Sequence, residues 1–160
     1  MFISKGFLSK RQLSFKRILT LMIVLTICFI FTQSLLPPEI AAKESEVASD
    51  IVADILPSDS AAEQYAENHM DKVAHFAEFG LLGLLVSLYI CAFAIKSALV
   101  GILSIVFNFV IAAFDETIQI FSGRMSDIND VMFDMLGFCA VSMVVYLVYY
   151  IFIKSKKKEI

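Results

Sequence analysis

Two polar clusters lie at the edges of otherwise apolar segments, and their residue types are those used in acid–base and metal chemistry. The first contains a lysine, a histidine and a glutamate. The second contains acids, an amide and an arginine, and three aspartates follow it. Ionisable groups this close to hydrocarbon are costly and mark a functional site by default. The residues are Lys72, His75 and Glu78, then Asp115, Glu116, Gln119 and Arg124, then Asp127, Asp130 and Asp134.

A histidine beside carboxylates can take up and release protons, so this composition is compatible with general acid–base catalysis. His75 and Glu116 are the candidate catalytic groups for a hydrolysis or a group transfer. Carboxylate oxygens, together with His75, are also able to hold a divalent cation. The spacing matches no established metal motif, and no serine or cysteine nucleophile motif accompanies it. The residues therefore leave both chemistries open and assign no cofactor.

Arg124 is the best candidate for holding an anionic group, because its planar guanidinium binds phosphate or carboxylate through two hydrogen bonds. Gly123 before it would allow close backbone approach. A simpler alternative is that Lys72 and Arg124 pair with nearby acids and fasten the helix ends together. The acids available for such pairing are Glu78, Asp115, Asp127 and Asp130.

The composition is that of an integral membrane protein. Of the 160 residues, 59% are hydrophobic and 18% are charged, against roughly 25% charged in soluble domains, and the mean hydropathy is +0.79. This length allows one domain over residues 1–160. No basic patch with interleaved aromatic residues is present, which argues against a nucleic-acid partner. Cys28, Cys91 and Cys139 lie within apolar runs and show neither metal-ligand nor disulfide-framework spacing.

Four apolar stretches are long enough to cross a membrane, which takes about 20 residues. They cover about 18–36, 73–95, 98–114 and 131–153. The predicted fold class is all-α, a polytopic bundle of four transmembrane helices. The segment 37–71 between the first two spans is expected to form a surface-lying loop or short helix. Within it, Ser45 and Ser60 are potential N-caps of two short helices that Pro57 separates.

The positions of the basic residues predict the orientation, because lysine and arginine near span ends are retained on the cytoplasmic side. Basic residues precede the first span and follow the last, and Lys96 lies between the second and third. Both termini are therefore predicted to be cytoplasmic and the acidic segment 37–71 to lie outside. Ala41 and Ala42 loosely resemble a secretory cleavage site, but Ile40 is not small, so we expect the first span to be retained. The flanking basic residues are Lys5, Lys10, Arg11, Lys16, Arg17, Lys154, Lys156, Lys157 and Lys158.

This topology brings both polar clusters to the outer boundary of the membrane. Side chains three or four positions apart share a helix face, which pairs His75 with Glu78 and, if the helix continues outward, Asp115 with Gln119. At the start of the fourth span, one helix face carries the three carboxylates of Asp127, Asp130 and Asp134. Such a face must be directed at a cavity or a cationic partner. The candidate ligand-binding residues are Lys72, His75, Glu78, Asp115, Glu116, Gln119, Arg124, Asp130 and Asp134.

Small residues in the second and fourth spans predict close helix packing. These residues are Gly80, Gly83, Gly137 and Ala140. Asn108 is an isolated polar residue in the third span, and we expect it to form an interhelical hydrogen bond.

These residues resemble the motifs of the VanZ-like family of membrane proteins. Two departures from the family pattern stand out: Asp134 lies where an asparagine is expected and adds a charge, and Val141 lies where a second glycine is common. The matching residues are Lys72, His75 and Phe76; Asp115, Glu116, Gln119, Phe121, Gly123 and Arg124; Asp130 and Gly137; and Ser34, Leu35, Leu36 and Pro37 after the first span.

The family takes its name from a protein associated with resistance to the glycopeptide teicoplanin. The resemblance therefore implies a multi-pass protein of the bacterial cytoplasmic membrane. Its outer-face polar pocket would bind a lipid-linked cell-wall precursor or a glycopeptide, with membrane lipids as the other partners. A membrane hydrolase or transferase acting on a lipid-linked envelope substrate is the alternative, and a small transporter is the second alternative. The sequence does not give the oligomeric state.

Overall fold

All the regular secondary structure of the described residues is helical. In the computed structural model, which describes residues 10–55, 60–93, 95 and 97–156, there are six helices and no strand. Four of them, α1, α4, α5 and α6, are long and apolar enough to cross a membrane. The all-α, multi-pass membrane fold expected from the sequence is confirmed. The elements are α1 Lys10–Ser34, α2 Pro38–Ile55, α3 Ala61–Asn68, α4 Met70–Ala92, α5 Ala98–Phe121 and α6 Ile128–Lys156.

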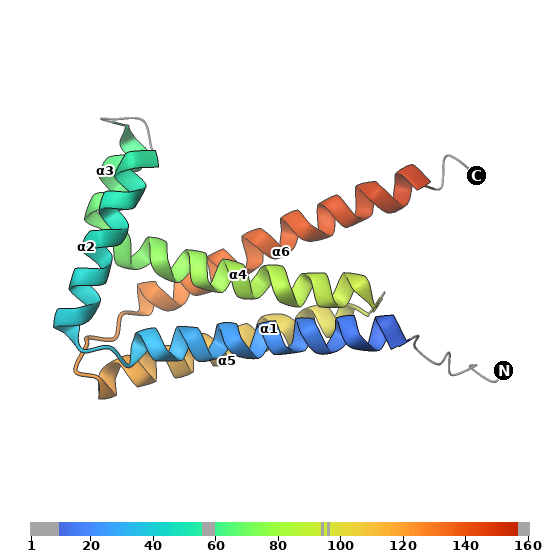
Figure 1. Cartoon of the computed structure of the whole chain (residues 1–160), viewed down its shortest axis with the longest axis horizontal. Coiled ribbons are helices and arrows are strands. Elements are labelled where there is room, and N and C mark those ends of the chain that lie inside the picture. The colour runs from blue at the N-terminus through green and yellow to red at the C-terminus, as the bar shows by residue number, and fades with distance from the viewer. Residues whose placement is uncertain (1–9, 56–59, 94, 96, 157–160) are drawn as a thin grey trace.

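The four long helices alternate in direction (Figure 1). Helices α1 and α5 end, and α4 and α6 begin, at the same end of the bundle, which we call the polar end. Helix α1 begins and α6 ends at the opposite end, where Arg11, Lys16 and Lys154 lie. This arrangement agrees with an even number of spans, while the side of the membrane that each end faces stays a prediction. Lys5, Lys96, Lys157 and Lys158 lie outside the described residues.

The third span is longer than its hydropathy indicates. The apolar stretch was expected to end at residue 114, but α5 continues to Phe121 and so includes Asp115, Glu116 and Gln119. These three side chains are buried against neighbouring helices, so the helix continues past the point where its sequence turns polar. Helix α1 is also longer than its apolar stretch, because it begins at Lys10 and not near residue 18.

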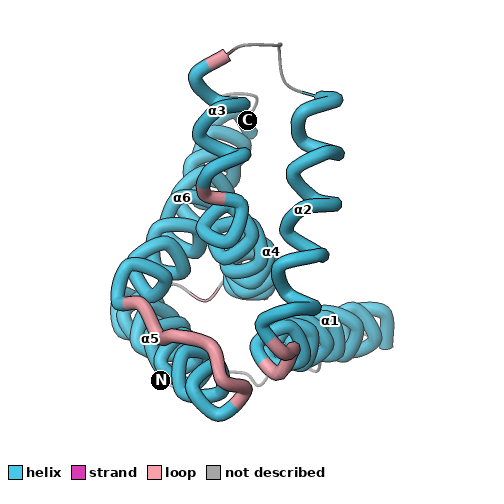
Figure 2. Tube along the Cα trace, turned by 90° about the vertical axis from the view of Figure 1, so that its left-hand side faces the viewer, coloured by secondary structure: helices cyan, strands magenta, loops and turns pink. Residues whose placement is uncertain are grey.

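Helices α2 and α3 form an arm at the polar end. Figure 1 shows α2 running across the end of the bundle, and Figure 2 shows α3 beside it. Helix α2 begins at Pro38, a residue suited to a first helical turn, so the expectation that Ser45 caps this helix is wrong. Ser60 does cap α3, because its Oγ accepts the Glu63 N–H at 3.1 Å. Pro57 lies outside the described residues.

Helices α4 and α6 cross at very short range. A Cβ added to Gly83 would lie 2.6 Å from the carbonyl oxygen of Phe138, and one added to Gly137 would collide with the backbone of Phe76. The predicted close packing of small residues is thus confirmed at this crossing. Val141, the departure from the family pattern, packs its Cγ2 over Gly80, at 3.2 Å from an added Cβ.

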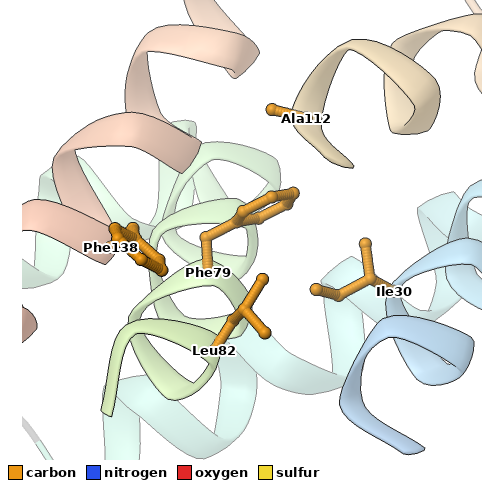
Figure 3. Close-up of a cluster of buried hydrophobic side chains, with 5 residues drawn as sticks. All are labelled: Ile30, Phe79, Leu82, Ala112 and Phe138. Carbon is orange, nitrogen blue, oxygen red and sulfur yellow. The ribbon is translucent and has the colours of Figure 1, made fainter. Parts of the chain in front are cut away.

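A small apolar core joins all four spans. Figure 3 shows Phe79 of α4 between Phe138 of α6 on one side and Ile30 of α1 on the other, with Leu82 and Ala112 beside them. All five are buried. Hydrophobic residues with no exposure form a dry layer that excludes water.

Four of the five residues in this apolar layer lie about one helical turn from a buried polar residue nearer the polar end. The layer therefore forms an apolar floor, and the polar groups gather on its outer side. The pairs are Ile30 with Ser34, Phe79 with His75, Ala112 with Asp115, and Phe138 with Asp134.

Candidate functional site

His75 lies at the centre of the buried polar cluster. Its Nδ1 lies 2.9 Å from Asp134 Oδ1 and 3.8 Å from Asp115 Oδ2. Its Nε2 lies 4.0 Å from Asp130 Oδ2 and 3.4 Å from the Gln119 amide nitrogen. The imidazole of α4 is therefore held between carboxylates of α5 and α6, in a position where a proton or a cation is stabilised.

Asp115 is fixed by groups from two helices. It shares a hydrogen bond with Ser34, the last residue of α1, and its Oδ2 accepts the Gln119 side-chain N–H at 2.9 Å. The Ser34 carbonyl also accepts the hydroxyl of Ser122 at 2.9 Å. The predicted pairing of Asp115 with Gln119 is confirmed, because α5 continues through both residues. These bonds fasten the end of α1 to the end of α5.

Glu116 faces the segment that leads into α6. Its Oε2 accepts the Ser126 hydroxyl at 2.6 Å and the Asp127 N–H at 3.0 Å. Its Oε1 is buried and has no hydrogen-bond partner. One oxygen of Glu116 therefore orients the carboxylate, and the other is free to bind a ligand.

Lys72 and Asp127 tie α4 to the start of α6. Asp127 is the N-cap of α6, since its Oδ1 accepts the Asn129 N–H at 2.9 Å. The Lys72 ammonium lies 3.0 Å from Asp130 Oδ1 and 3.3 Å from Asp127 Oδ2. The Asn129 backbone hydrogen bond, and after it the Lys72 ammonium, lower the pKa of Asp127 below its ordinary value. Asp127 thus caps the helix at its surface and is not part of a buried acidic face.

Arg124 is positioned by the turn that ends α5. Gly123 adopts a φ of 84°, its N–H bonds to the Ile120 carbonyl, and the Arg124 N–H bonds to the Gln119 carbonyl. This is the Schellman end of a helix, which favours glycine. An added Cβ at Gly123 would meet nothing within 4 Å, so the turn requires glycine for its backbone angle and not for close approach.

A pocket of about 300 Å³ opens between the polar end and the arm. Helices α4 and α5 contribute the histidine and most of its acids, α2 contributes Glu44 and small side chains, and Arg124 lies in its wall. No carboxylate within the described ranges forms an ion pair with the Arg124 guanidinium. The alternative that both basic residues pair with acids and fasten the helix ends together therefore holds for Lys72 and not for Arg124. Among the lining residues are Ser34, Ala41, Ser45, Ala48, His75, Glu78, Asp115, Gln119 and Arg124.

Comparison with protein families agrees with the residues at the polar end. The VanZ/LLP1 family pattern matches residues 7–155. The chain belongs to the VanZ/LLP1 family. No curated protein and no solved structure matches the chain. The family match covers all four spans and every residue of the site, which confirms the VanZ-like resemblance.

The nine candidate binding residues of this VanZ/LLP1 protein all lie at the polar end. Glu78 forms no hydrogen bond with His75, but both side chains line the same pocket. Asp134, which replaces the asparagine of the family pattern, has no exposure and contacts His75. Asn108 donates from its side chain to Met135 Sδ at 3.2 Å, the expected contact between helices.

Three serines of the VanZ/LLP1 site were missed by the sequence reasoning. Ser34 and Ser122 link α1 to α5, and Ser126 orients Glu116. A serine gives little hydropathy signal and has no motif of its own here. Only Ser34 could have been found, because it begins the family-like segment after the first span.

Proposed function

We propose that this VanZ/LLP1 protein binds the anionic headgroup of a lipid-linked cell-envelope intermediate in the pocket at the polar end. Binding takes place on the outer face of a bacterial cytoplasmic membrane and changes susceptibility to glycopeptides such as teicoplanin. The observation that carries the proposal is Arg124, which lines the pocket and forms no ion pair with a carboxylate of the described residues.

The pocket offers complementary groups for a phosphate and for sugar hydroxyls. A guanidinium binds a phosphate through two parallel hydrogen bonds. Carboxylates accept hydrogen bonds from hydroxyl groups, and Glu78 and Asp115 supply such acceptors in the same pocket. A sugar phosphate carried on a lipid presents both kinds of group, whereas a simple phospholipid presents fewer hydroxyls.

The position of the pocket also suits a lipid-linked ligand. It lies where four apolar helices end, so a bound headgroup keeps its hydrocarbon chain at the depth of the spans. The apolar floor formed around Phe79 stops the headgroup from moving further along the bundle. The ligand is thus held at the boundary between hydrocarbon and water.

The proposal is tested by binding to the purified protein in detergent. Undecaprenyl diphosphate and teicoplanin are titrated in parallel against wild type, Arg124→Gln and, as a matched control, Arg11→Gln at the opposite end. We expect Arg124→Gln to weaken lipid diphosphate binding by at least roughly tenfold, since a charged hydrogen bond contributes about 1.5–3 kcal/mol. Arg11→Gln should bind as wild type does. Equal binding by all three proteins, or teicoplanin binding alone, would contradict the headgroup proposal.

A membrane hydrolase or transferase is the second candidate, and the 2.9 Å contact between His75 and Asp134 supports it. A carboxylate that orients an imidazole is a usual arrangement for a general base. Incubation with the same lipid diphosphate decides between the two: release of phosphate that disappears in His75→Ala indicates an enzyme, and binding without release indicates a binding protein. A transporter has less support, because the buried ionisable side chains of the described part all lie at the polar end.

A further inference from the structure

Three potential metal ligands from three helices meet inside the buried cluster. One ligand atom from each of His75, Glu116 and Asp130 lies within 4.8 Å of the other two. The three residues are only 7%, 6% and 5% exposed. Ligands of one tetrahedral zinc lie roughly 3.4 Å apart, given bonds of about 2.0–2.2 Å. The side chains would need to approach by about an ångström to share one cation.

The imidazole of His75 is oriented as a metal-binding histidine. Nδ1 lies against the Asp134 carboxylate, an acceptor, and Nε2 faces the donor nitrogen of the Gln119 amide. This network assigns the proton to Nδ1 and a lone pair to Nε2. Metal-bound histidines typically donate the other ring N–H to a carboxylate in this way. Asp134 is therefore a positioning residue for the ring.

Glu116 and Asp130 each keep one oxygen available. Ser126 and the Asp127 N–H occupy Glu116 Oε2, while the buried Oε1 has no partner. Lys72 binds Asp130 Oδ1, and Asp130 Oδ2 lies 4.0 Å from His75 Nε2. A buried carboxylate oxygen without a partner is unfavourable, and a cation would satisfy it.

We propose that His75, Glu116 and Asp130 bind one divalent transition-metal cation, Zn²⁺ or Mn²⁺. One imidazole with two carboxylates suits these ions, whereas Ca²⁺ and Mg²⁺ prefer oxygen ligands throughout. Three protein ligands leave a coordination position for water or an anionic group. The inference does not depend on headgroup binding, because a cation can bind in the absence of any lipid.

A second group of possible ligands, His75 with Asp115 and Asp134, is less suitable. It would use Nδ1, which already contacts the Asp134 carboxylate, and Asp115 is occupied by Ser34 and Gln119. Asp130 faces Nε2 of His75, whereas Asp115 and Asp134 face Nδ1. Substitutions of these acids therefore distinguish the two groups of ligands.

The first measurement is cation binding by the purified full chain in detergent. After removal of metal with a chelator, Zn²⁺ and Mn²⁺ are titrated separately, and we expect one equivalent to bind and to raise the melting temperature. Glu116→Gln and Asp130→Asn should weaken binding at least tenfold. Asp134→Asn keeps a hydrogen-bond acceptor for Nδ1, so binding should weaken by less. The exposed Asp54→Asn is the matched control and should bind as wild type does.

Folded wild type that binds neither ion, or Glu116→Gln that binds as tightly as wild type, would overturn the proposal. A second measurement does not depend on the folding of the ligand variants. Electron paramagnetic resonance of Mn²⁺ bound to His69→Gln protein, in which His75 is the remaining histidine, should show coupling to one imidazole nitrogen. Absence of this coupling in the manganese-loaded protein would also overturn it.

Discussion

The two ends of the bundle differ in how closely their helices pack. Beside the polar end, α4 and α6 approach until the backbone of Gly137 meets that of Phe76, and the neighbouring side chains of His75 and Asp134 are buried there. Toward the opposite end α6 diverges from α4 (Figure 1), and most of its large apolar side chains are exposed. These include Met143, Val144, Leu147, Val148 and Ile151.

This difference shows what the close packing is for. Apolar side chains gain little free energy by moving from lipid into a helix contact, because lipid tails are as apolar as the side chains themselves. Polar side chains gain much, because lipid offers them no hydrogen-bond partner. Helix contact is therefore concentrated where His75, Asp115 and Asp134 need partners, and it is relaxed where the surface already suits the membrane.

Glycine substitution at the crossing of α4 and α6 and at the opposite end should give different results. Gly83→Ala places a Cβ 2.6 Å from the Phe138 carbonyl oxygen, and overpacking of this kind typically costs about 1–3 kcal/mol. Gly101→Ala near the start of α5 meets nothing within 4 Å and should be neutral or slightly stabilising, because alanine favours helix. Helical circular dichroism during heating in detergent measures both. Equal melting temperatures of the two variants would refute the close contact between α4 and α6.

Loss of a lysine should also depend on the end at which it lies. Lys72→Met leaves the buried Asp130 without its cation, and an unsatisfied buried acceptor costs about 1–3 kcal/mol, or more for a charge. Lys16→Met at the opposite end loses only contacts with the rings of Tyr89 and Phe93, each at 5.8 Å, which contribute about 0.5–1 kcal/mol when exposed. Unfolding in a denaturing detergent should rank Lys72→Met below Lys16→Met. The reverse order would mean that Asp130 is satisfied by another group.

The smallest effect is expected at Asp127, on the surface of the polar end. Its folded-state pKa lies below the ordinary value of 3.8, so its charge stabilises the fold above about pH 4 and that contribution is lost as the pH falls through the lower, folded-state pKa. Asp127→Asn keeps a capping oxygen but removes the charge. Melting temperatures of the two proteins should therefore differ slightly at pH 7 and converge in strong acid. A difference that persists unchanged at low pH would assign the effect to the cap alone.

The sequence predicted the spans and the gathering of the site residues well. Hydropathy located four helices, and the alternating direction of the spans brought His75, Asp115 and Asp130 to one end. It failed at the end of the third span, because hydropathy reports transfer to lipid and not burial against another helix. Because Asp115, Glu116 and Gln119 are polar, hydropathy placed the end of the span before them.

The sequence did not predict which residues of the site contact one another. The chain contains more acids than basic groups near the site, so spacing alone does not decide that Lys72 forms an ion pair with Asp130 while Arg124 forms none with the described carboxylates. That choice follows from the turn at Gly123, which directs Arg124 toward the pocket wall. The capping role of Asp127 likewise depends on where α6 begins, and boundaries are the least certain part of a sequence-based prediction.

The contact between His75 and Asp134 also has a consequence for synthesis of the chain. The two residues are 59 positions apart, and α6 is the last of the four described spans to leave the ribosome, since chains are made from the N-terminus. Until α6 enters the membrane, the His75 imidazole lacks Asp134 and the Lys72 ammonium lacks Asp130. The polar contacts of the bundle are therefore completed only when α6 is inserted. Before that, α4 must stay beside the insertion machinery with part of its ion pairs unformed.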